Sequence, residues 1–249
     1  MVELGRHQLQ AIQELRPGYI LRGGVGTGKS RTSIAWFLHY ICGASFPING
    51  AGSYGTVPNG RDLYIITTAK KRDSGDWLGE CADFLLTTTR ENSYGNIQVT
   101  VDSWNNIEAY KDVKDAVFIF DEQRLVGKGA WVKAYLKIAK ANQWIILSAT
   151  PGDNWVDYIP VFIANGFYKN RTDFIDQHVE YNKFTSFPSI KKFHNVGKLD
   201  QLRRQITVHM EYARHTKRII KQIAVGYSKE LYERVWKDRW HVYEERRVS

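Results

Sequence analysis

The chain has 249 residues, of which 43% are hydrophobic and 13% aromatic, so it is neither disordered nor fibrous and can bury a sizeable core. Its formal net charge of +9 is uneven, because residues 191–249 carry 15 Lys and Arg against 7 Asp and Glu, whereas residues 1–190 carry a net charge of only +1. Localised positive charge favours a polyanionic partner such as nucleic acid, with a merely solvated basic helix as the alternative.

The first predicted element is a helix over residues 4–15, since its leucine and isoleucine side chains fall near one helical face. Gln8 lies near the start of this helix. A glutamine side chain has a donor and an acceptor in fixed geometry, which suits the edge of an adenine base. Taken alone, a glutamine here is ordinarily a surface residue, so its assignment to adenine depends on a nucleotide-binding motif elsewhere in the chain.

A strand at residues 19–21 is followed by a complete phosphate-loop motif and then by a helix over residues 31–41. The motif consists of Gly23, Gly24, Val25, Gly26, Thr27, Gly28, Lys29 and Ser30. Its glycines let the backbone curl so that successive N–H groups and the helix N-terminus point at one anion. Lys29 can then reach the β- and γ-phosphates, and the Ser30 hydroxyl can ligate a bridging magnesium ion. The motif therefore predicts a nucleoside triphosphate, ATP if Gln8 binds adenine, together with Mg²⁺.

Residues 43–60 are rich in turn-forming residues and predict a long loop, which a buried strand over residues 62–68 follows. Three consecutive cations come next, before a helix in which Trp77 is expected to lie in the core. Ligands of open α/β sheets bind at the carboxyl ends of the strands, so these cations are candidates for contacts with nucleic-acid phosphates. A solvated turn is the alternative. The candidate residues are Thr68, Lys70, Lys71 and Arg72.

Two acidic residues end a later strand. Residues 96–103 predict one strand, and residues 116–120 predict an unbroken apolar strand that delivers Asp121 and Glu122 to its carboxyl end. One carboxylate beside a nucleotide-bound magnesium ion can complete the hydration shell of the ion through water. The neighbouring carboxylate can orient and deprotonate the water that attacks the γ-phosphate, which assigns Asp121 to the metal and Glu122 to catalysis.

A helix between residues 125 and 143 returns the chain to the sheet, and residues 144–147 predict a further buried strand. Ser148 and Thr150 follow at the same edge as the acids, where hydroxyls can link the acids to a bound strand of nucleic acid. A capped strand exit is the alternative interpretation. Beyond residue 154 we expect aromatic-rich helices, an irregular stretch over 181–196, a basic helix over 198–223, a short strand at 223–226 and a final helix.

In order and approximate spacing, these pieces resemble the first RecA-like lobe of superfamily 2 helicases over about residues 4–160. The corresponding segments are Gln8 for the Q-type motif, Gly23–Ser30 for motif I, residues 67–70 for motif Ia, residues 121–122 for motif II and residues 148–150 for motif III. Residues 120–123 and 144–157 look closest to bacteriophage DEAD/DEAH-box helicases, and Swi/Snf-type remodelling ATPases are similar too.

This resemblance implies an α/β fold of the RecA-like P-loop NTPase type, with three layers and a mostly parallel central sheet. It also implies an ATP-dependent helicase or translocase that acts on nucleic acid, DNA rather than RNA. Lys29 and Ser30 would hold phosphate and Mg²⁺, and Ser148 and Thr150 would couple hydrolysis to strand movement. No stretch of the sequence suits a membrane span, and Cys42 and Cys81 are expected as reduced thiols in the cytoplasm, that of a host cell if the protein is phage-encoded.

Two features depart from the family pattern. Gln123 and Arg124 follow the acids where the family has Ala-Asp or Ala-His, so the residue that contacts motif III is replaced. No second lobe and no arginine-finger motif is found in the sequence. We therefore expect a RecA-like lobe over residues 1–165 and a basic helical extension over 166–249 that leads toward a second lobe. Without an arginine finger from that lobe or from a partner chain, worth a factor of about 10³–10⁵ in turnover, hydrolysis should be weak.

Two other classes of protein stay open. A phage packaging ATPase of the terminase type also combines a phosphate loop with an acid pair, although an acidic nuclease domain would be expected to follow rather than a basic tail. A nucleotide-switched module could instead bind nucleic acid without motor activity, with ATP ordering only the loops that grip the strand.

Overall fold

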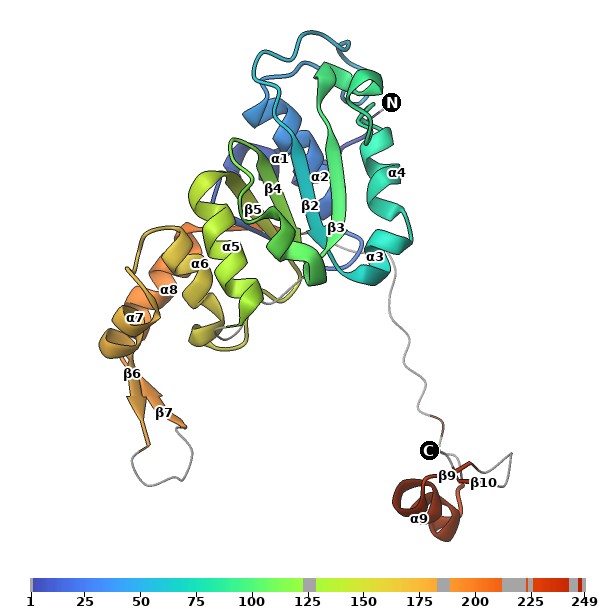
Figure 1. Cartoon of the computed structure of the whole chain (residues 1–249), viewed down its shortest axis with the longest axis vertical. Helices are drawn as coiled ribbons and strands as arrows, with labels where there is room; N and C mark the ends of the chain where they lie inside the picture. Colours follow the sequence, from blue (N-terminus) through green and yellow to red (C-terminus); the bar gives the residue numbers. More distant parts are fainter. Residues whose placement is uncertain are drawn as a thin grey trace. The chain divides into compact units, whose positions relative to one another are not determined.

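Six parallel strands form the central sheet of the larger part of the chain (Figure 1). The computed structural model describes residues 2–122, 129–182, 189–211, 223, 226–241 and 246–247. The strands lie in the order β3-β2-β4-β5-β1-β8, and each is parallel to its neighbours. Their bounds are β1 Ile20–Gly23, β2 Leu63–Thr67, β3 Val99–Ser103, β4 Val117–Asp121, β5 Gln143–Ser148 and β8 Thr207–Met210. The carboxyl ends of all six strands therefore lie at one edge of the sheet.

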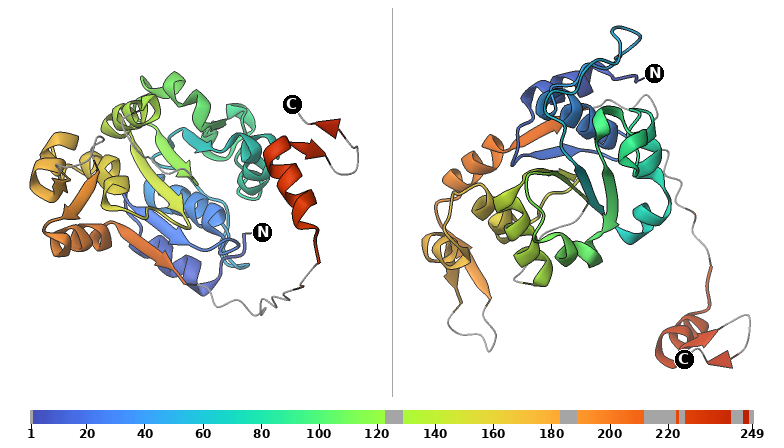
Figure 2. Two further views of the ribbon diagram at one scale, coloured as in Figure 1. Left: turned by 90° about the horizontal axis from the view of Figure 1, so that it is seen from below. Right: turned by 45° about the horizontal axis from the view of Figure 1, so that its top comes forward.

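Helices cover both faces of this sheet (Figures 1 and 2). Side chains alternate along each strand, so Val117 and Ile119 of β4 pack into one layer and Phe118 and Phe120 into the other. The first layer contains α1 (Arg6–Glu14), α2 (Lys29–Trp36), which continues as a π-helical turn over Phe37–Ile41, and α4 (Asp76–Ala82). The second contains the 3₁₀ turn η4 (Trp104–Tyr110), α5 (Ala130–Ala141), α6 (Ile159–Ala164), α7 (Arg171–His178) and α8 (Val196–Gln205). The expected three-layer α/β fold is confirmed.

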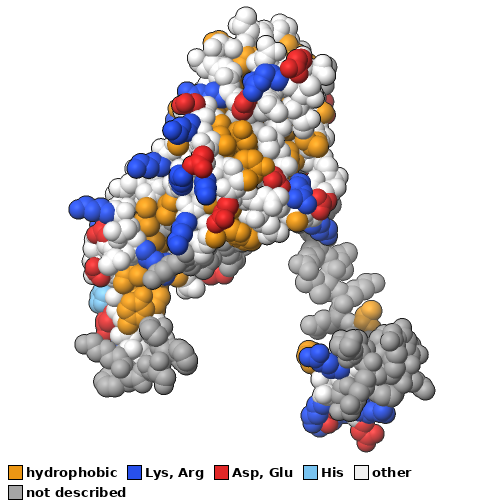
Figure 3. Space-filling view, in the orientation of Figure 1, with side chains coloured by type: hydrophobic (Ala, Val, Ile, Leu, Met, Phe, Trp, Pro, Cys, Tyr) orange, Lys and Arg blue, Asp and Glu red, His pale blue; other side chains and the backbone are white. Residues whose placement is uncertain are grey.

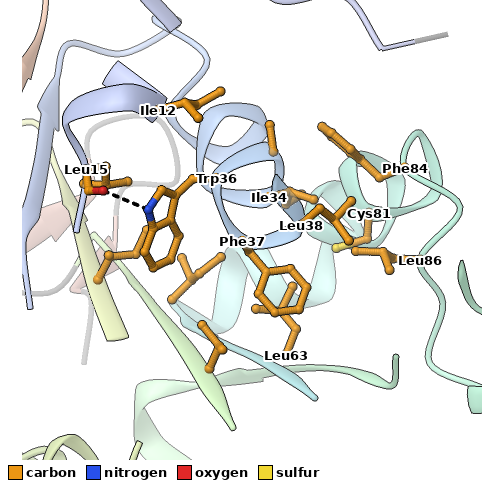
Figure 4. Close-up of a cluster of buried hydrophobic side chains, with 14 of the residues drawn as sticks. Ile12, Leu15, Ile34, Trp36, Phe37, Leu38, Leu63, Cys81, Phe84 and Leu86 are labelled. Carbon is orange, nitrogen blue, oxygen red and sulfur yellow. Dashed lines mark hydrogen bonds between the residues drawn. The ribbon is translucent and has the colours of Figure 1, made fainter. Parts of the chain in front are cut away.

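The core of the first layer joins α1, α2 and α4 (Figure 4). Leu15 lies beside Trp36, and Ile34 points toward Cys81 of α4. The buried indole N–H of Trp36 donates to the carbonyl oxygen of Leu15 at 3.0 Å. A buried indole is stabilised when its N–H finds such an acceptor. Because α2 begins directly after the phosphate loop, this packing holds the helical end of the loop in place.

The elements expected in the first 150 residues are present, and the expected loop over 43–60 is confirmed. One detail differs in the segment that carries the three cations. They lie inside a short helix of their own, α3 (Ala69–Asp73), and Gly75, with a φ of +74°, separates this helix from α4. Short 3₁₀ turns occur at Arg90–Asn92, Tyr94–Asn96 and Trp155–Tyr158.

The structure corrects the sequence interpretation beyond residue 178. Part of the stretch expected to be irregular forms an antiparallel hairpin of β6 (Val179–Tyr181) and β7 (Ile190–Phe193). The basic helix expected over 198–223 is wrong, because α8 ends at Gln205 and the chain continues into β8. Buried Val208 and Met210 alternate with more exposed residues, which is the pattern of a strand.

Contacts divide the chain into two units, Met1–Tyr212 and Ala213–Ser249. The sequence predicted a boundary after residue 165 instead. β8 pairs with β1 from Ile20 opposite Thr207 to Gly23 opposite Met210, so the chain through residue 210 belongs to the central sheet. A strand that hydrogen-bonds beside the phosphate-loop strand cannot be assigned to a separate extension.

The second unit contains α9 (Lys229–Asp238) and a short antiparallel pair of strands, β9 (Trp240–His241) and β10 (Arg246–Arg247). The Ser228 hydroxyl accepts the backbone N–H of Leu231 at 3.3 Å and caps α9. The expected final helix is confirmed, whereas residues 224 and 225 of the strand expected at 223–226 lie outside the described residues.

Positive and negative side chains are interspersed on the face of the larger unit seen in Figure 3. Arg90 pairs with Asp62 at 2.7 Å and Lys137 with Asp112 at 2.6 Å, so neighbouring charges partly neutralise one another. This face is therefore mixed in charge rather than uniformly positive. As for membranes, the part of the chain that the structure describes has no helix with the length and apolarity needed to cross a bilayer.

Met210 tests the place of β8 in the sheet, since its side chain is 3% exposed and packs beside Gly23. We expect Met210→Ala to lower the free energy of unfolding by about 2–5 kcal/mol, because the substitution leaves a cavity in the core. Ile223→Ala, at a position 79% exposed, should change it by less than about 0.5 kcal/mol. Chemical denaturation measures both. Equally small effects would place Met210 outside the core.

Candidate functional site

The phosphate loop runs from the end of β1 to the start of α2. Gly26 and Gly28 have φ angles of +80° and +79°, in the left-handed region that favours glycine. The Thr27 hydroxyl donates to the Gly24 carbonyl oxygen at 2.9 Å and closes the turn. A loop curled in this way, in front of a helix N-terminus, directs backbone N–H groups at a single anion.

Lys29 begins α2, and its side chain folds back beneath the loop. Its ammonium group donates to the carbonyl oxygens of Gly23 at 2.8 Å and Gly24 at 3.0 Å, and the residue is 9% exposed. Burial lowers the pKa of Lys29 below its ordinary value, while the charges of Asp121 and Glu122 act in the opposite direction. The predicted phosphate-binding lysine and the two predicted acids therefore lie within electrostatic range of one another.

Gln8 supports the loop from the side of α1. Its amide nitrogen donates to the Gly28 carbonyl oxygen and to the Thr32 hydroxyl, both at 3.2 Å, and its amide oxygen accepts the Gly5 N–H at 2.7 Å. The side chain is 7% exposed. These bonds give Gln8 a structural role at the loop, and its contact with adenine stays a prediction.

The acids lie at the carboxyl end of β4, in two different environments. Asp121 is 1% exposed, and its Oδ2 accepts hydrogen bonds from Thr67, Trp77 and Lys71. Glu122 leaves the strand with a φ of +59°, an uncommon conformation for a residue with a Cβ, and its side chain is 38% exposed. Backbone strain of this kind is concentrated at functional sites. The bend buries one carboxylate and leaves its neighbour accessible to solvent.

Lys71 bridges the two acids. Its Nζ lies 2.8 Å from Glu122 Oε1 and 3.2 Å from Asp121 Oδ2. Burial by itself lowers the pKa of this lysine, but the hydrogen bonds and charges of Glu122 and Asp121 outweigh it and raise the pKa above its ordinary value. Lys71 was predicted to contact a nucleic-acid phosphate, whereas the structure brings it to the acid pair.

The other predicted nucleic-acid contacts lie around α3. The Thr68 hydroxyl accepts a backbone N–H and caps the helix. Arg72 pairs with Asp73 at 2.8 Å and with Asp102 at 3.2 Å, while Lys70 is exposed. Lys70 is therefore the member of the set most accessible to a polyanion, and contact of any of them with nucleic acid stays a prediction.

Ser148 and Thr150 lie at the end of β5, between the strand that carries the acids and the strand that carries the phosphate loop. Ser148 is 7% exposed, and its hydroxyl accepts the backbone N–H of Thr150 at 3.1 Å. Their predicted coupling role is not tested by this geometry. Gln123 and Arg124, the atypical pair after the acids, lie outside the described residues.

Two cavities of about 670 Å³ each flank the phosphate loop. The first is lined by residues that include Ser30, Lys71 and Trp77, and the second by residues that include Gln8, Thr27 and Gly28. Arg31 and Glu80 line both, and the Arg31 Nε donates to Glu80 at 3.0 Å, which ties α2 to α4. Cavities of this volume are within the usual range for small-molecule ligands.

The oxygen atoms at this edge suit a magnesium ion. Mg²⁺ prefers oxygen ligands, keeps several waters and is usually bound through one or two carboxylates together with substrate phosphates. Ser30 supplies a hydroxyl at the start of α2, and Asp121 supplies a buried carboxylate that Lys71 links to the cavity lined by Ser30. This set of donors, completed by phosphate oxygens and water, fits the ion.

Comparison with known proteins supports the class of fold. No protein-family profile and no curated protein matches the chain. The SWI2/SNF2 ATPase core of Sulfolobus solfataricus, solved in complex with double-stranded DNA, is similar with a TM-score of 0.53 at 15% identity over 82% of this chain. The helicase domain of Pyrococcus furiosus Hef gives a TM-score of 0.42 at 18% identity over 64% of this chain. This chain spans 43% and 36% of the lengths of those two chains.

The larger unit therefore has the fold of the RecA-like lobes of helicase-type ATPases, as the sequence predicted. What the sequence did not identify is how Asp121 is held. Trp77 was expected in the core and is 2% exposed, but its hydrogen bond to Asp121 was not foreseen. A tryptophan that is predicted to be buried needs an acceptor for its N–H, but the identity of that acceptor depends on how α4 packs on the sheet.

Gly26 and Gly28 form a matched pair for testing the loop. Alanine strains the backbone at both, by about 1–3 kcal/mol, since both have positive φ. At Gly28, however, an added Cβ lies 2.5 Å from the Gln8 Nε2, whereas no described atom lies within 4 Å of it at Gly26. We expect Gly28→Ala to lower the Tm and the affinity for a fluorescent ATP analogue more than Gly26→Ala does.

A second substitution checks the cause. Gln8→Ala in the Gly28→Ala background should restore part of the difference in Tm, because it removes the atom that the new Cβ meets. Equal losses for the two glycine variants, or no recovery in the double variant, would contradict the role assigned to Gln8.

Proposed function

We propose that this chain is the ATP-binding lobe of a nucleic-acid-dependent motor of the helicase or translocase class. The observation that carries the proposal is that Lys29, Asp121 and Glu122 stand within electrostatic range of one another at the carboxyl edge of one parallel sheet, beside a cavity that Ser30 and Lys71 line. Phosphate binding, metal binding and proton acceptance are thereby available within one site. The fold shared with an ATPase core solved on double-stranded DNA supports DNA as the polyanion.

Each residue has a defined part in the proposed reaction. The loop N–H groups and Lys29 bind the β- and γ-phosphates, and Ser30 and Asp121 hold Mg²⁺. When bound, the ion neutralises charge on the phosphates. Glu122, on its solvent-accessible bend, orients a water and accepts its proton as that water attacks the γ-phosphorus and the bond to the β-phosphate oxygen breaks.

Coupling to nucleic acid is proposed for two groups of residues at the same edge. Ser148 ends β5 and Thr150 follows it, between the strand of the acids and the strand of the loop, so a shift of the acid pair on hydrolysis can reach them. Lys70, with its neighbours on α3, supplies exposed charge next to the end of β2. Gln8 is proposed to read adenine from the cavity that it lines.

A second lobe completes the proposed motor. Transfer of the γ-phosphoryl group concentrates charge that an arginine finger stabilises, and loss of that arginine typically slows turnover by a factor of about 10³–10⁵. This chain spans less than half of the ATPase core that it resembles. We therefore propose that the arginine comes from a further lobe or from a partner chain, and that the chain alone turns over slowly.

Steady-state ATP hydrolysis with and without double-stranded DNA tests the proposal. We expect Lys29→Ala and Glu122→Gln each to reduce DNA-stimulated hydrolysis at least a hundredfold, because the first removes phosphate binding and the second the proton acceptor. Lys140→Ala and Glu108→Gln, at exposed positions outside the loop and the acid pair, are the matched controls and should keep the wild-type rate.

Two results would contradict the motor proposal. Unchanged hydrolysis in both site variants would remove the assigned chemistry. Nucleotide-dependent DNA binding without any turnover would favour the switched binding module instead.

Contact with phosphates also predicts salt-dependent binding. On duplex DNA the logarithm of the affinity should fall with the logarithm of the salt concentration by about 0.9 per neutralised phosphate. Fluorescence anisotropy with a labelled duplex measures this slope. Lys70→Ala should reduce it by about one contact, and the exposed control Lys140→Ala should leave it unchanged. A flat response in the wild type would refute the electrostatic contacts.

A further inference from the structure

Three donors from three different elements share one oxygen of Asp121. Oδ2 accepts the Thr67 hydroxyl at 2.9 Å from the end of β2 and the Trp77 indole N–H at 2.9 Å from α4. It also accepts the Lys71 ammonium at 3.2 Å from α3. None of these three donors is directed at Oδ1, so the network fixes the carboxylate by one of its two oxygens.

Two of the three donors are rigid. Thr67 is fully buried and Trp77 is 2% exposed, so neither can exchange its hydrogen bond for water. The Lys71 side chain is 32% exposed and also pairs with Glu122, so its bond to Asp121 is the one most easily replaced. The orientation of the buried carboxylate therefore depends mainly on the threonine and the tryptophan.

The orientation of a carboxylate needs such support. Its terminal torsion is broad and roughly two-fold, so a side chain with no donors has no single preferred direction for its oxygens. Hydrogen bonds to metal-binding carboxylates from outer residues set that direction, and their removal typically weakens metal affinity by a factor of about 10–100. Hydrogen bonds to a charged acceptor are also the stronger kind, which suits a positioning role.

We propose that Trp77 and Thr67 are positioning residues of the ATPase site, which hold Asp121 by Oδ2 so that Oδ1 is presented to the water shell of Mg²⁺. This inference rests on the proposed function, since it concerns the same metal. It extends that function to α4, an element on which the sequence placed no functional residue. α4 also carries Glu80, which pairs with Arg31, the residue that follows Ser30 in α2.

Trp104 provides a control for Trp77, because its indole N–H also bonds to Asp121, but to the backbone of that residue. The indole N–H of Trp104, 3% exposed, donates to the main-chain carbonyl oxygen of Asp121 at 3.1 Å. Trp77→Phe and Trp104→Phe therefore remove the same group from the surroundings of the same residue, and both leave an aromatic ring. Only the first removes a donor from the carboxylate.

The experiment measures the affinity for a fluorescent, slowly hydrolysed ATP analogue with and without Mg²⁺. The ratio of the affinity with Mg²⁺ to the affinity without it is the gain due to the metal. We expect Trp77→Phe and Thr67→Val each to reduce this gain about tenfold while the metal-free affinity stays within about twofold of wild type. Trp104→Phe should keep the full gain, although its Tm falls. Thr67→Ser, which retains the hydroxyl, should restore most of the gain lost in Thr67→Val.

The outcomes separate the inference from the proposed function. If the wild type shows no gain with Mg²⁺, the proposed function fails. If the wild type shows the gain and Trp77→Phe and Thr67→Val keep it like Trp104→Phe, the positioning role is overturned and the bonds support only the fold. If Trp77→Phe does not fold, the comparison of Thr67→Val with Thr67→Ser decides, since an equal gain in both overturns the proposal.

Discussion

Burial of the Asp121 carboxylate is the constraint on which the site depends. A carboxylate that is 1% exposed is stable as an anion only when hydrogen-bond donors or cations replace the water it has lost. Here β2, α3 and α4 each contribute one donor, and the buried ammonium of Lys29 adds positive charge from α2. The packing of these four elements around the end of β4 therefore also determines the environment of the carboxylate at the site.

The same argument explains why neighbouring acids differ. The left-handed bend at Glu122 turns the chain out of the strand, so the second carboxylate remains partly in solvent with Lys71 as its partner. A buried carboxylate that is held by donors suits a metal, whereas an accessible one suits exchange of protons with water. A single strand end thus provides two carboxylates with separate proposed roles.

Support for the phosphate loop comes from elements on both sides of it. α1 contributes Gln8, whose amide bonds to the Gly28 carbonyl, and the core around Trp36 holds α1 against α2. β8 pairs with β1 on the side opposite β5, and Met210 of β8 packs against Gly23 at the start of the loop. The loop is therefore held by residues from near the beginning and near the end of the larger unit.

Local patterns in the sequence were enough to predict strands β1 to β5, the phosphate loop and the acid pair, because each is encoded by a short run of residues. The glycines of the loop and the apolar run of residues 116–120 need no distant partner to be recognised. The strand β8 was missed because Leu202, Ile206 and Met210 also fit the spacing of a helix, and only pairing with β1 favours the strand. The partners of Asp121 were missed for a related reason. Thr67, Lys71 and Trp77 are distant from Asp121 in sequence, and only the packing of α3 and α4 at the edge of the sheet brings their donors to one oxygen.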